Sequence, residues 1–167
     1  AAYGYPGAER PVSVSPRLTT EGARAEYHWD EGLTEELHNG PDGLEQIFVL
    51  SERPVADGAV APLGIALRTA GNLQPRVVEA GQGVSFADAG GVERLTYRGL
   101  VVSDAMGQRV PAWFEVKERL VRTGVLLMSD VSSRSGEAKM ELWRFALPGQ
   151  FHPHLPHVDV VNDEPLF

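Results

Sequence analysis

The stretch HPHLPH, residues 152–157, carries the side chains best suited to chemistry in this chain. His152, His154 and His157, followed by Asp159, are ligand types that zinc, copper and nickel accept. In an extended chain His152 and His154 project to the same side, so two imidazoles could share one metal. However, the intervening prolines stiffen the segment, and its spacing matches no helical or hairpin metal site. The favoured interpretation is therefore a contact segment lying on a neighbouring surface, with metal binding as the weaker alternative and no cofactor expected.

Paired acidic residues offer a second chemistry, because glycoside hydrolysis uses two carboxylates that face each other across a cleft. Adjacent residues on a strand project to opposite faces, so neighbouring acids do not form such a pair. We expect these pairs to be solvated in hairpins and in the tail; they are Asp30-Glu31, Glu35-Glu36 and Asp163-Glu164. The absence of cysteine removes thiolate catalysis, disulfides and zinc–thiolate sites, and no serine has the Gly-x-Ser-x-Gly context of a hydrolase. We expect no enzymatic activity.

Three tryptophans, Trp29, Trp113 and Trp143, could line a carbohydrate-binding surface. Trp113 falls on the opposite face of its predicted strand from Ala112 and Phe114. It is therefore expected at the surface or beneath a tail, and it is a candidate partner-binding residue. Core or interface packing is the favoured role of the tryptophans, with glycan contact as the alternative.

The charge balance argues against a nucleic-acid partner. The chain has a formal net charge of −8 from 15 basic and 23 acidic residues and no run of Lys or Arg, whereas phosphate binding needs a clustered basic surface. The longest apolar runs are a few residues, as from Val125 to Met128, and a membrane helix needs about 20. We expect neither nucleic-acid binding nor a transmembrane segment.

Short runs of alternating apolar and polar residues, separated by turn residues, recur from residue 24 onward. This pattern is typical of an all-β, antiparallel sandwich, in which each strand has one buried and one solvated face. The predicted strands are 24–29, 33–38, 44–50, 63–68, 76–79, 84–86, 95–97, 100–103, 110–116, 119–128 and 139–147. The predicted core comprises Leu44, Phe48, Leu50, Ile65, Leu67, Phe86, Leu95, Tyr97, Phe114 and Val116.

The two ends of the chain differ from the middle. Residues 1–23 are rich in Pro, Gly, Ser and Thr, which predicts an extended arm or a weak edge strand. The tail is rich in Pro and His, yet it carries apolar side chains that a purely solvated segment would not need. We divide the chain into an N-terminal arm (1–23), a β-sandwich (24–147) and an extended C-terminal tail (148–167). The candidate partner-binding residues of the two ends are Tyr3, Tyr5, Phe151, His152, His154, Leu155, His157, Val158, Val160, Leu166 and Phe167.

Two phrases carry a family resemblance: NGPDGLEQIFVLSERP (39–54) and LQPRVVEAGQGVSFADAGGVERLTYRGLVVSDAMGQRVPAWFEV (73–116). Their order and spacing resemble a β-rich module of large secreted bacterial proteins, which often precedes FG-GAP, integrin-like propeller repeats. The similarity spans roughly residues 24–128. Ile47 stands where the family favours Gly, and residues 130–136 depart from its closing strand, so we expect the module to act apart from propeller repeats.

The residues of these phrases predict turns and strand boundaries. Gly43 and Gly99 stand where a turn needs a positive φ or a close backbone approach. Asp88 and Asp104 stand where a carboxylate can cap a turn. Pro111 opens a strand, where its missing N–H is harmless. The motif is therefore interpreted as specifying a fold and not a reaction centre.

The resemblance and the start Ala1-Ala2-Tyr3, which is compatible with signal-peptide removal, predict an exported protein, periplasmic or extracellular. The favoured hypothesis is a non-catalytic structural module. It would be an extrinsic accessory subunit that stabilises a larger bacterial assembly through its extended ends. Its partners would be other protein subunits, in a membrane complex, a filament or the cell wall. A carbohydrate- or cell-surface-binding module is the alternative, followed by a metal-binding protein that uses the His tail.

Overall fold

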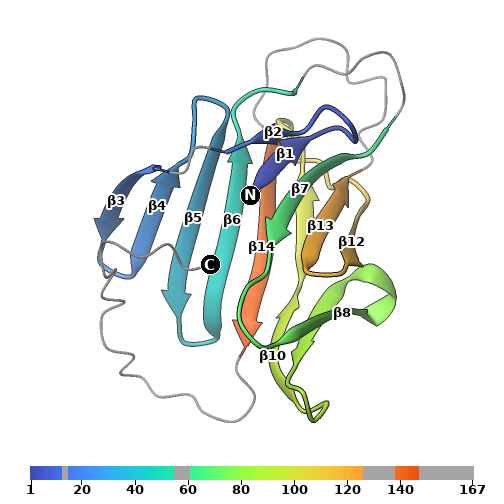
Figure 1. Ribbon diagram of the computed structural model, residues 1–167. Coiled ribbons are helices and arrows are strands. Elements are labelled where there is room, and N and C mark those ends of the chain that lie inside the picture. The colour runs from blue at the N-terminus through green and yellow to red at the C-terminus, as the bar shows by residue number, and fades with distance from the viewer. Residues whose placement is uncertain (13–14, 55–60, 126–137, 147–167) are drawn as a thin grey trace.

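The computed structural model describes residues 1–12, 15–54, 61–125 and 138–146, the last of these by backbone only. Its strands form two antiparallel sheets (Figure 1), which confirms the all-β, sandwich-like fold. Within the described residues the one helical element is a 3-10 turn, Glu79–Gly81. Each run of alternating residues predicted as a strand from residue 24 onward overlaps a strand of the structure.

The smaller sheet, sheet A, has five strands in the order β12-β13-β7-β1-β2. Its strands are β12 (Ala112–Lys117), β13 (Leu120–Val125), β7 (Leu63–Arg68), β1 (Ala2–Gly4) and β2 (Arg10–Pro11). The prediction for residues 63–68 matches β7 at both ends.

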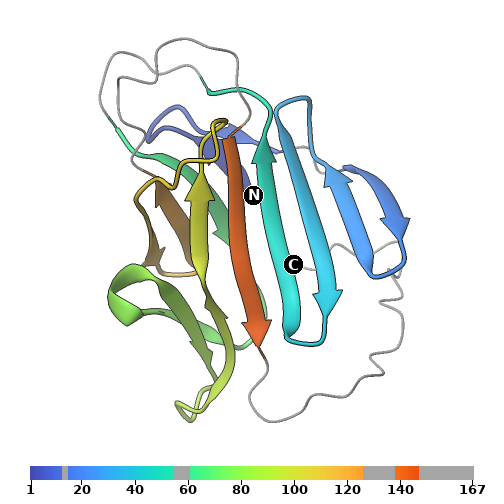
Figure 2. The same ribbon diagram turned by 180° about the vertical axis from the view of Figure 1, so that it is seen from behind.

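The larger sheet, sheet B, has nine strands, eight of them in the order β3-β4-β5-β6-β14-β10-β9-β8, while β11 also pairs with β14. Its strands are β3 (Arg17–Glu21), β4 (Arg24–His28), β5 (Leu33–Gly40), β6 (Gly43–Leu50), β14 (Ala138–Ala146), β10 (Glu93–Arg98), β9 (Gly83–Ala87), β8 (Gln74–Val78) and β11 (Leu100–Ser103). In Figures 1 and 2 sheet A lies over β14 and β10, while β3, β4 and β5 extend to one side of it.

The predicted turn residues have the expected geometry. Gly43 and Gly99 have φ angles of 123° and 79°, in the region that favours glycine. Asp88 Oδ1 accepts hydrogen bonds from the N–H groups of Gly90 and Val92 at 2.9 and 3.0 Å. Asp104 caps its turn in the same way. The family-like motif thus marks where strands stop.

The N-terminal residues are extended, as expected, but they pair within the sheets. β1 lies inside sheet A, where Tyr3 is opposite Ile65, and β3 is the edge of sheet B. Tyr3 and Tyr5 are only 2% and 5% exposed. The hydroxyl of Tyr3 donates to the Asp30 carboxylate at 3.1 Å, and Arg53 Nε donates to the hydroxyl of Tyr5 at 2.7 Å. The prediction that Tyr3 and Tyr5 bind a partner is wrong, because their rings fill the core and their hydroxyls are satisfied inside the chain.

The core lies between the two sheets and follows the predicted alternation. Six of the ten predicted core residues are buried: Phe48, Leu50, Ile65, Phe86, Tyr97 and Phe114. The other four, Leu44, Leu67, Leu95 and Val116, are half-buried. The ring of Tyr97 in sheet B packs against the ring of Phe114 in sheet A, with 5.2 Å between the ring centroids. The prediction missed Tyr3, Tyr5, Leu33, Leu63, Val84, Leu100, Val102, Val121 and Val125, which complete the buried cluster.

Phe48 offers a test of this core, since its ring is 1% exposed. We expect Phe48→Ala to lower the free energy of unfolding by about 3–5 kcal/mol, from lost burial and the cavity left behind. Denaturant unfolding of both proteins measures the difference. Val49→Ala, a change at the neighbouring half-buried position on the opposite face, is the control and should cost clearly less. A loss below about 1 kcal/mol for Phe48→Ala would contradict this register of β6.

Candidate binding face on the large sheet

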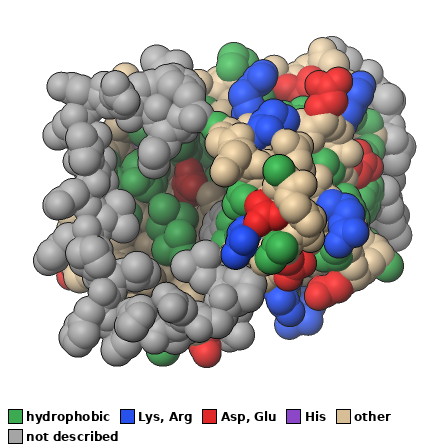
Figure 3. All heavy atoms as spheres, turned by 60° about the horizontal axis from the view of Figure 1, so that its bottom comes forward, with side chains coloured by type: hydrophobic (Ala, Val, Ile, Leu, Met, Phe, Trp, Pro, Cys, Tyr) green, Lys and Arg blue, Asp and Glu red, His purple; other side chains and the backbone are tan. Residues whose placement is uncertain are grey.

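The inner face of β3, β4 and β5 continues beyond the part of sheet B that sheet A covers. Leu18 is opposite Tyr27, and Tyr27 is opposite Glu35, so these side chains share one face. Trp29 and Leu37 follow on the same face by alternation. We call Leu18, Tyr27, Trp29 and Leu37 the open face; Leu18 is 36% exposed and the other three are half-buried. Figure 3 shows hydrophobic side chains gathered on this side of the molecule, with an acidic group among them.

The opposite side of the same strands is ionic. Arg24 contacts Glu26 and Glu36 at 2.9 Å each, and His28 Nε2 lies 2.8 Å from Glu26. The two faces of β4 and β5 therefore differ as alternation requires, one apolar and one charged.

Glu35 is the exception on the apolar side. It is 9% exposed, whereas Glu36 is turned to the ionic face. The prediction that adjacent acids face opposite sides holds, but the prediction that Glu35 is solvated is wrong. The period-2 pattern turns Glu35 inward, and it stays there because the protein supplies hydrogen-bond donors.

Those donors come from the neighbouring strand β6 and from the turn after β4. Trp29 Nε1 donates to Glu35 Oε2 at 2.7 Å, and Gln46 Nε2 donates to the other carboxylate oxygen. The hydroxyl of Tyr97 in turn donates to Gln46 Oε1 at 2.9 Å. The resulting chain Trp29–Glu35–Gln46–Tyr97, the polar chain, runs from the open face into the core.

Burial is the largest cause of the pKa shifts of Glu35 and Tyr97. Burial raises the pKa of Glu35, and the donated hydrogen bonds from Gln46 and Trp29 partly oppose that effect. Burial, followed by the nearby charge of Glu35, also raises the pKa of Tyr97. Because each oxygen of Glu35 already has a donor, the carboxylate is suited to fixing the indole of Trp29 in place.

An aromatic pair stands beside Glu35 on the open face. The rings of Tyr27 and Trp29 lie 6.0 Å apart with an interplanar angle of 19°, a stacked arrangement. The hydrogen bond from Nε1 to Glu35 fixes the indole of Trp29, and the ring of Tyr27 stacks against that indole. This gives the open face a fixed aromatic surface.

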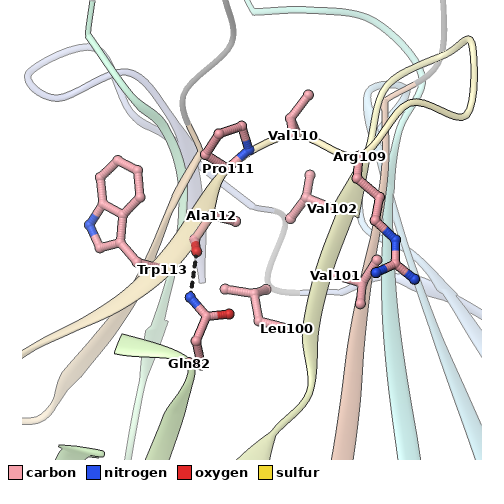
Figure 4. A pocket seen from close by; sticks show the side chains of 9 residues that line it. All are labelled: Gln82, Leu100, Val101, Val102, Arg109, Val110, Pro111, Ala112 and Trp113. Carbon is pink, nitrogen blue, oxygen red and sulfur yellow. Dashed lines mark hydrogen bonds between the residues drawn. The ribbon is translucent and has the colours of Figure 1, made fainter. Parts of the chain in front are cut away.

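A pocket of about 330 Å³ lies where β11 approaches β12. Figure 4 shows its apolar lining of Leu100, Val102 and Val110, closed on one side by a hydrogen bond of 2.9 Å from Gln82 Nε2 to the carbonyl of Ala112.

The ring of Trp113 points away from the apolar lining of this pocket. A Cβ on Gly124 would come within 2.5 Å of the indole, so Trp113 packs over the glycine that it faces across the strands. It lies half-buried on the outer face of sheet A, and its role in partner binding stays a prediction.

The remaining predicted site residues, Phe151, His152, His154, Leu155, His157, Val158, Val160, Leu166 and Phe167, lie outside the described residues. Five residues of this face and its polar chain were not predicted as members of a site: Leu18, Tyr27, Glu35, Leu37 and Gln46. The available signal was the spacing of Tyr27 and Trp29, two aromatic residues at i and i+2 on one strand face.

No cluster of three or more His, Asp or Glu side chains with metal-binding geometry occurs within the described part of the chain. None of the described helical segments has the length and apolar character needed to cross a membrane. Comparisons with protein-family models, curated proteins and solved structures found no match to this chain.

Glu35→Gln tests the polar chain, because it keeps the shape and removes the titratable group. Since burial raises the pKa of Glu35, the folded protein holds this proton more tightly than the unfolded chain does. The stabilising contribution is therefore complete below the ordinary glutamate pKa and is lost as pH rises through the folded-state pKa. We expect the unmodified chain to lose more stability than Glu35→Gln between about pH 4 and about pH 8, measured by denaturant unfolding.

Glu31→Gln, the same change at an exposed position in the neighbouring turn, is the matched control against which the pH profile of Glu35→Gln is compared. Identical pH profiles for the unmodified chain and Glu35→Gln would contradict the role assigned to Glu35.

Proposed function

We propose that this chain is a non-catalytic interaction module, an accessory subunit of an exported bacterial assembly, and that another protein subunit docks on the open face. The observation that supports this most is the apolar inner surface of β3, β4 and β5, which extends past sheet A. Fully burying a large apolar side chain contributes about 1.5–3 kcal/mol, and a partner strand or loop laid across this face gains part of that from each of several residues at once. The resemblance to modules of secreted bacterial proteins supports a location outside the cytoplasm.

A protein partner fits this surface better than a small ligand does. The four residues of the open face are spread over three neighbouring strands and the turn after β4. Such a broad, half-buried surface matches protein interfaces, where aromatic anchors are surrounded by polar residues. Apart from the buried Glu35, the ionic residues described above for β4 and β5 project to the far side and leave the apolar positions clear.

A non-catalytic role is supported by the state of Glu35. A general acid or base must reach a substrate proton, and both oxygens of this buried carboxylate are occupied by Trp29 and Gln46. Its raised pKa follows from burial within a structural hydrogen-bond chain.

The C-terminal tail is proposed as the second anchor to the assembly. β14 ends at Ala146, where it pairs with Thr96, so removing residues 150–167 leaves every described strand intact. We expect this truncation to leave the β domain folded and to abolish its incorporation into the native assembly. Circular dichroism measures the fold, and co-purification from the native host measures incorporation. Normal assembly without residues 150–167 would refute the anchoring role, and failure to fold would place these residues in the core.

Tyr27→Lys tests the open face directly, because it puts a charge at the centre of the apolar surface. We expect capture of partner subunits from the native host to be lost, while the thermal unfolding of the domain changes only modestly. Thr34→Lys adds the same charge on the ionic face, and we expect it to retain capture. Equal capture by both variants would refute docking at the open face.

Glycan binding is the second candidate, favoured by the stacked pair Tyr27–Trp29 on the open face. Aromatic rings provide flat apolar surfaces on which a sugar ring can stack. Saturable NMR shifts at Tyr27 on addition of cell-wall oligosaccharides, absent in Tyr27→Lys, would decide for a glycan over a protein partner.

A further inference from the structure

Strand β3 forms one edge of sheet B, and its outer side pairs with no other strand among the described residues. All five of its residues, from Arg17 to Glu21, are exposed. It pairs with β4 in continuous register from Arg17 opposite His28 to Glu21 opposite Arg24. Such an edge offers backbone N–H and C=O groups that can pair with another strand.

Natural edge strands are usually protected against pairing by a bulge, an inward charge or a proline within the strand. β3 has an unbroken register and none of these within its five residues. Its two charges instead have opposite signs and lie at its two ends, Arg17 and Glu21, with Thr19 midway between them. Within the part of the chain that the structure describes, neither Arg17 nor Glu21 forms an ion pair.

We propose that β3 pairs antiparallel with β3 of a second copy of this chain, about a twofold axis at Thr19. In this register Arg17 stands opposite Glu21 of the second copy, and the symmetry repeats that pair on the other side of the axis. Leu18 stands opposite Thr20 of the second copy, and the two Thr19 residues face each other. Every residue of the strand thus meets a compatible partner.

Charge selects this register over the alternatives. A parallel, in-register pair would place Arg17 beside Arg17 and Glu21 beside Glu21, which is unfavourable. Moving the twofold axis by one residue would place Arg17 or Glu21 opposite Thr19 and lose both ion pairs. The antiparallel register centred on Thr19 is the one that satisfies both charges.

The pairing would also extend the open face. Leu18 lies on that face, opposite Tyr27 in its own chain, and is 36% exposed. Across the axis it gains Thr20 of the second copy as a neighbour, so the inner faces of the two large sheets form one continuous surface. A five-residue strand pair is smaller than a standard protein interface, so the dimer is expected to be weak and concentration-dependent.

Sedimentation of the full chain over a wide range of concentrations at low salt tests the proposal. We expect a reversible monomer–dimer equilibrium. Arg17→Glu and Glu21→Arg each place like charges opposite each other twice, so each should raise the dimer dissociation constant at least about tenfold. Arg109→Glu, an equal charge change at an exposed position away from β3, is the matched control and should dimerise normally.

Mixing the two variants gives the sharpest outcome. A chain with Arg17→Glu is complementary to a chain with Glu21→Arg at both ion pairs, so a 1:1 mixture should recover the dimer. The double variant Arg17→Glu with Glu21→Arg should also dimerise with itself. A chain that stays monomeric at all concentrations would overturn the proposal, as would undiminished dimerisation of Arg17→Glu or a mixture that fails to recover.

The unmodified chain gives a test that does not depend on the folding of any variant. In a mixture of isotope-labelled and unlabelled chains, we expect intermolecular NOEs between residues 17 and 21 and between the two Thr19 residues. A dimer without these contacts pairs by another surface and would refute the role of β3.

Discussion

Two sheets of unequal width share one core, and the surplus strands of the wider sheet leave an apolar face beyond that core. A strand that alternates apolar and polar residues needs cover on its apolar side. Sheet A provides that cover over β14 and β10, and β3, β4 and β5 carry the same alternation past it. The proposed docking surface and the unpaired edge at β3 are both consequences of this difference in width.

The border between the covered and open parts of sheet B is built from polar side chains. Glu35, Gln46 and Tyr97 bring a carboxylate, an amide and a hydroxyl into a region that is otherwise apolar. At the start of β5, the hydroxyl of Tyr3 donates a hydrogen bond to Asp30 in the turn that precedes the strand. The carboxylate of Asp30 also accepts the N–H groups of Gly32 and Leu33 at 2.8 Å each. Hydrogen bonds thus fix the position of β5 at the border of the core.

The sequence predicted the strands well because turn residues and period-2 alternation are local signals. Gly43, Asp88, Gly99 and Asp104 mark turns through their own backbone or side-chain preferences, which need no knowledge of distant residues. The burial of Tyr3 could not be predicted in this way. It depends on pairing with Ile65, far along the chain, while the local composition indicates an arm. The open face was missed for the same reason, since its existence depends on how many strands each sheet contains.

Glu35 shows what a local pattern leaves out and why the residue is tolerated. Alternation placed it on the inner face, but its donors, Trp29 and Gln46, are identified only by the register of β4, β5 and β6. A one-residue slip of β5 would turn Glu36 inward in its place and expose Leu33, which is fully buried. The burial of Leu33 therefore sets the register of β5, and the buried carboxylate, unfavourable in itself, is tolerated because Trp29 and Gln46 donate hydrogen bonds to it. Correct register in β5 in turn sets the alternation of its neighbour β4, and therefore which side of sheet B presents Tyr27 and Trp29.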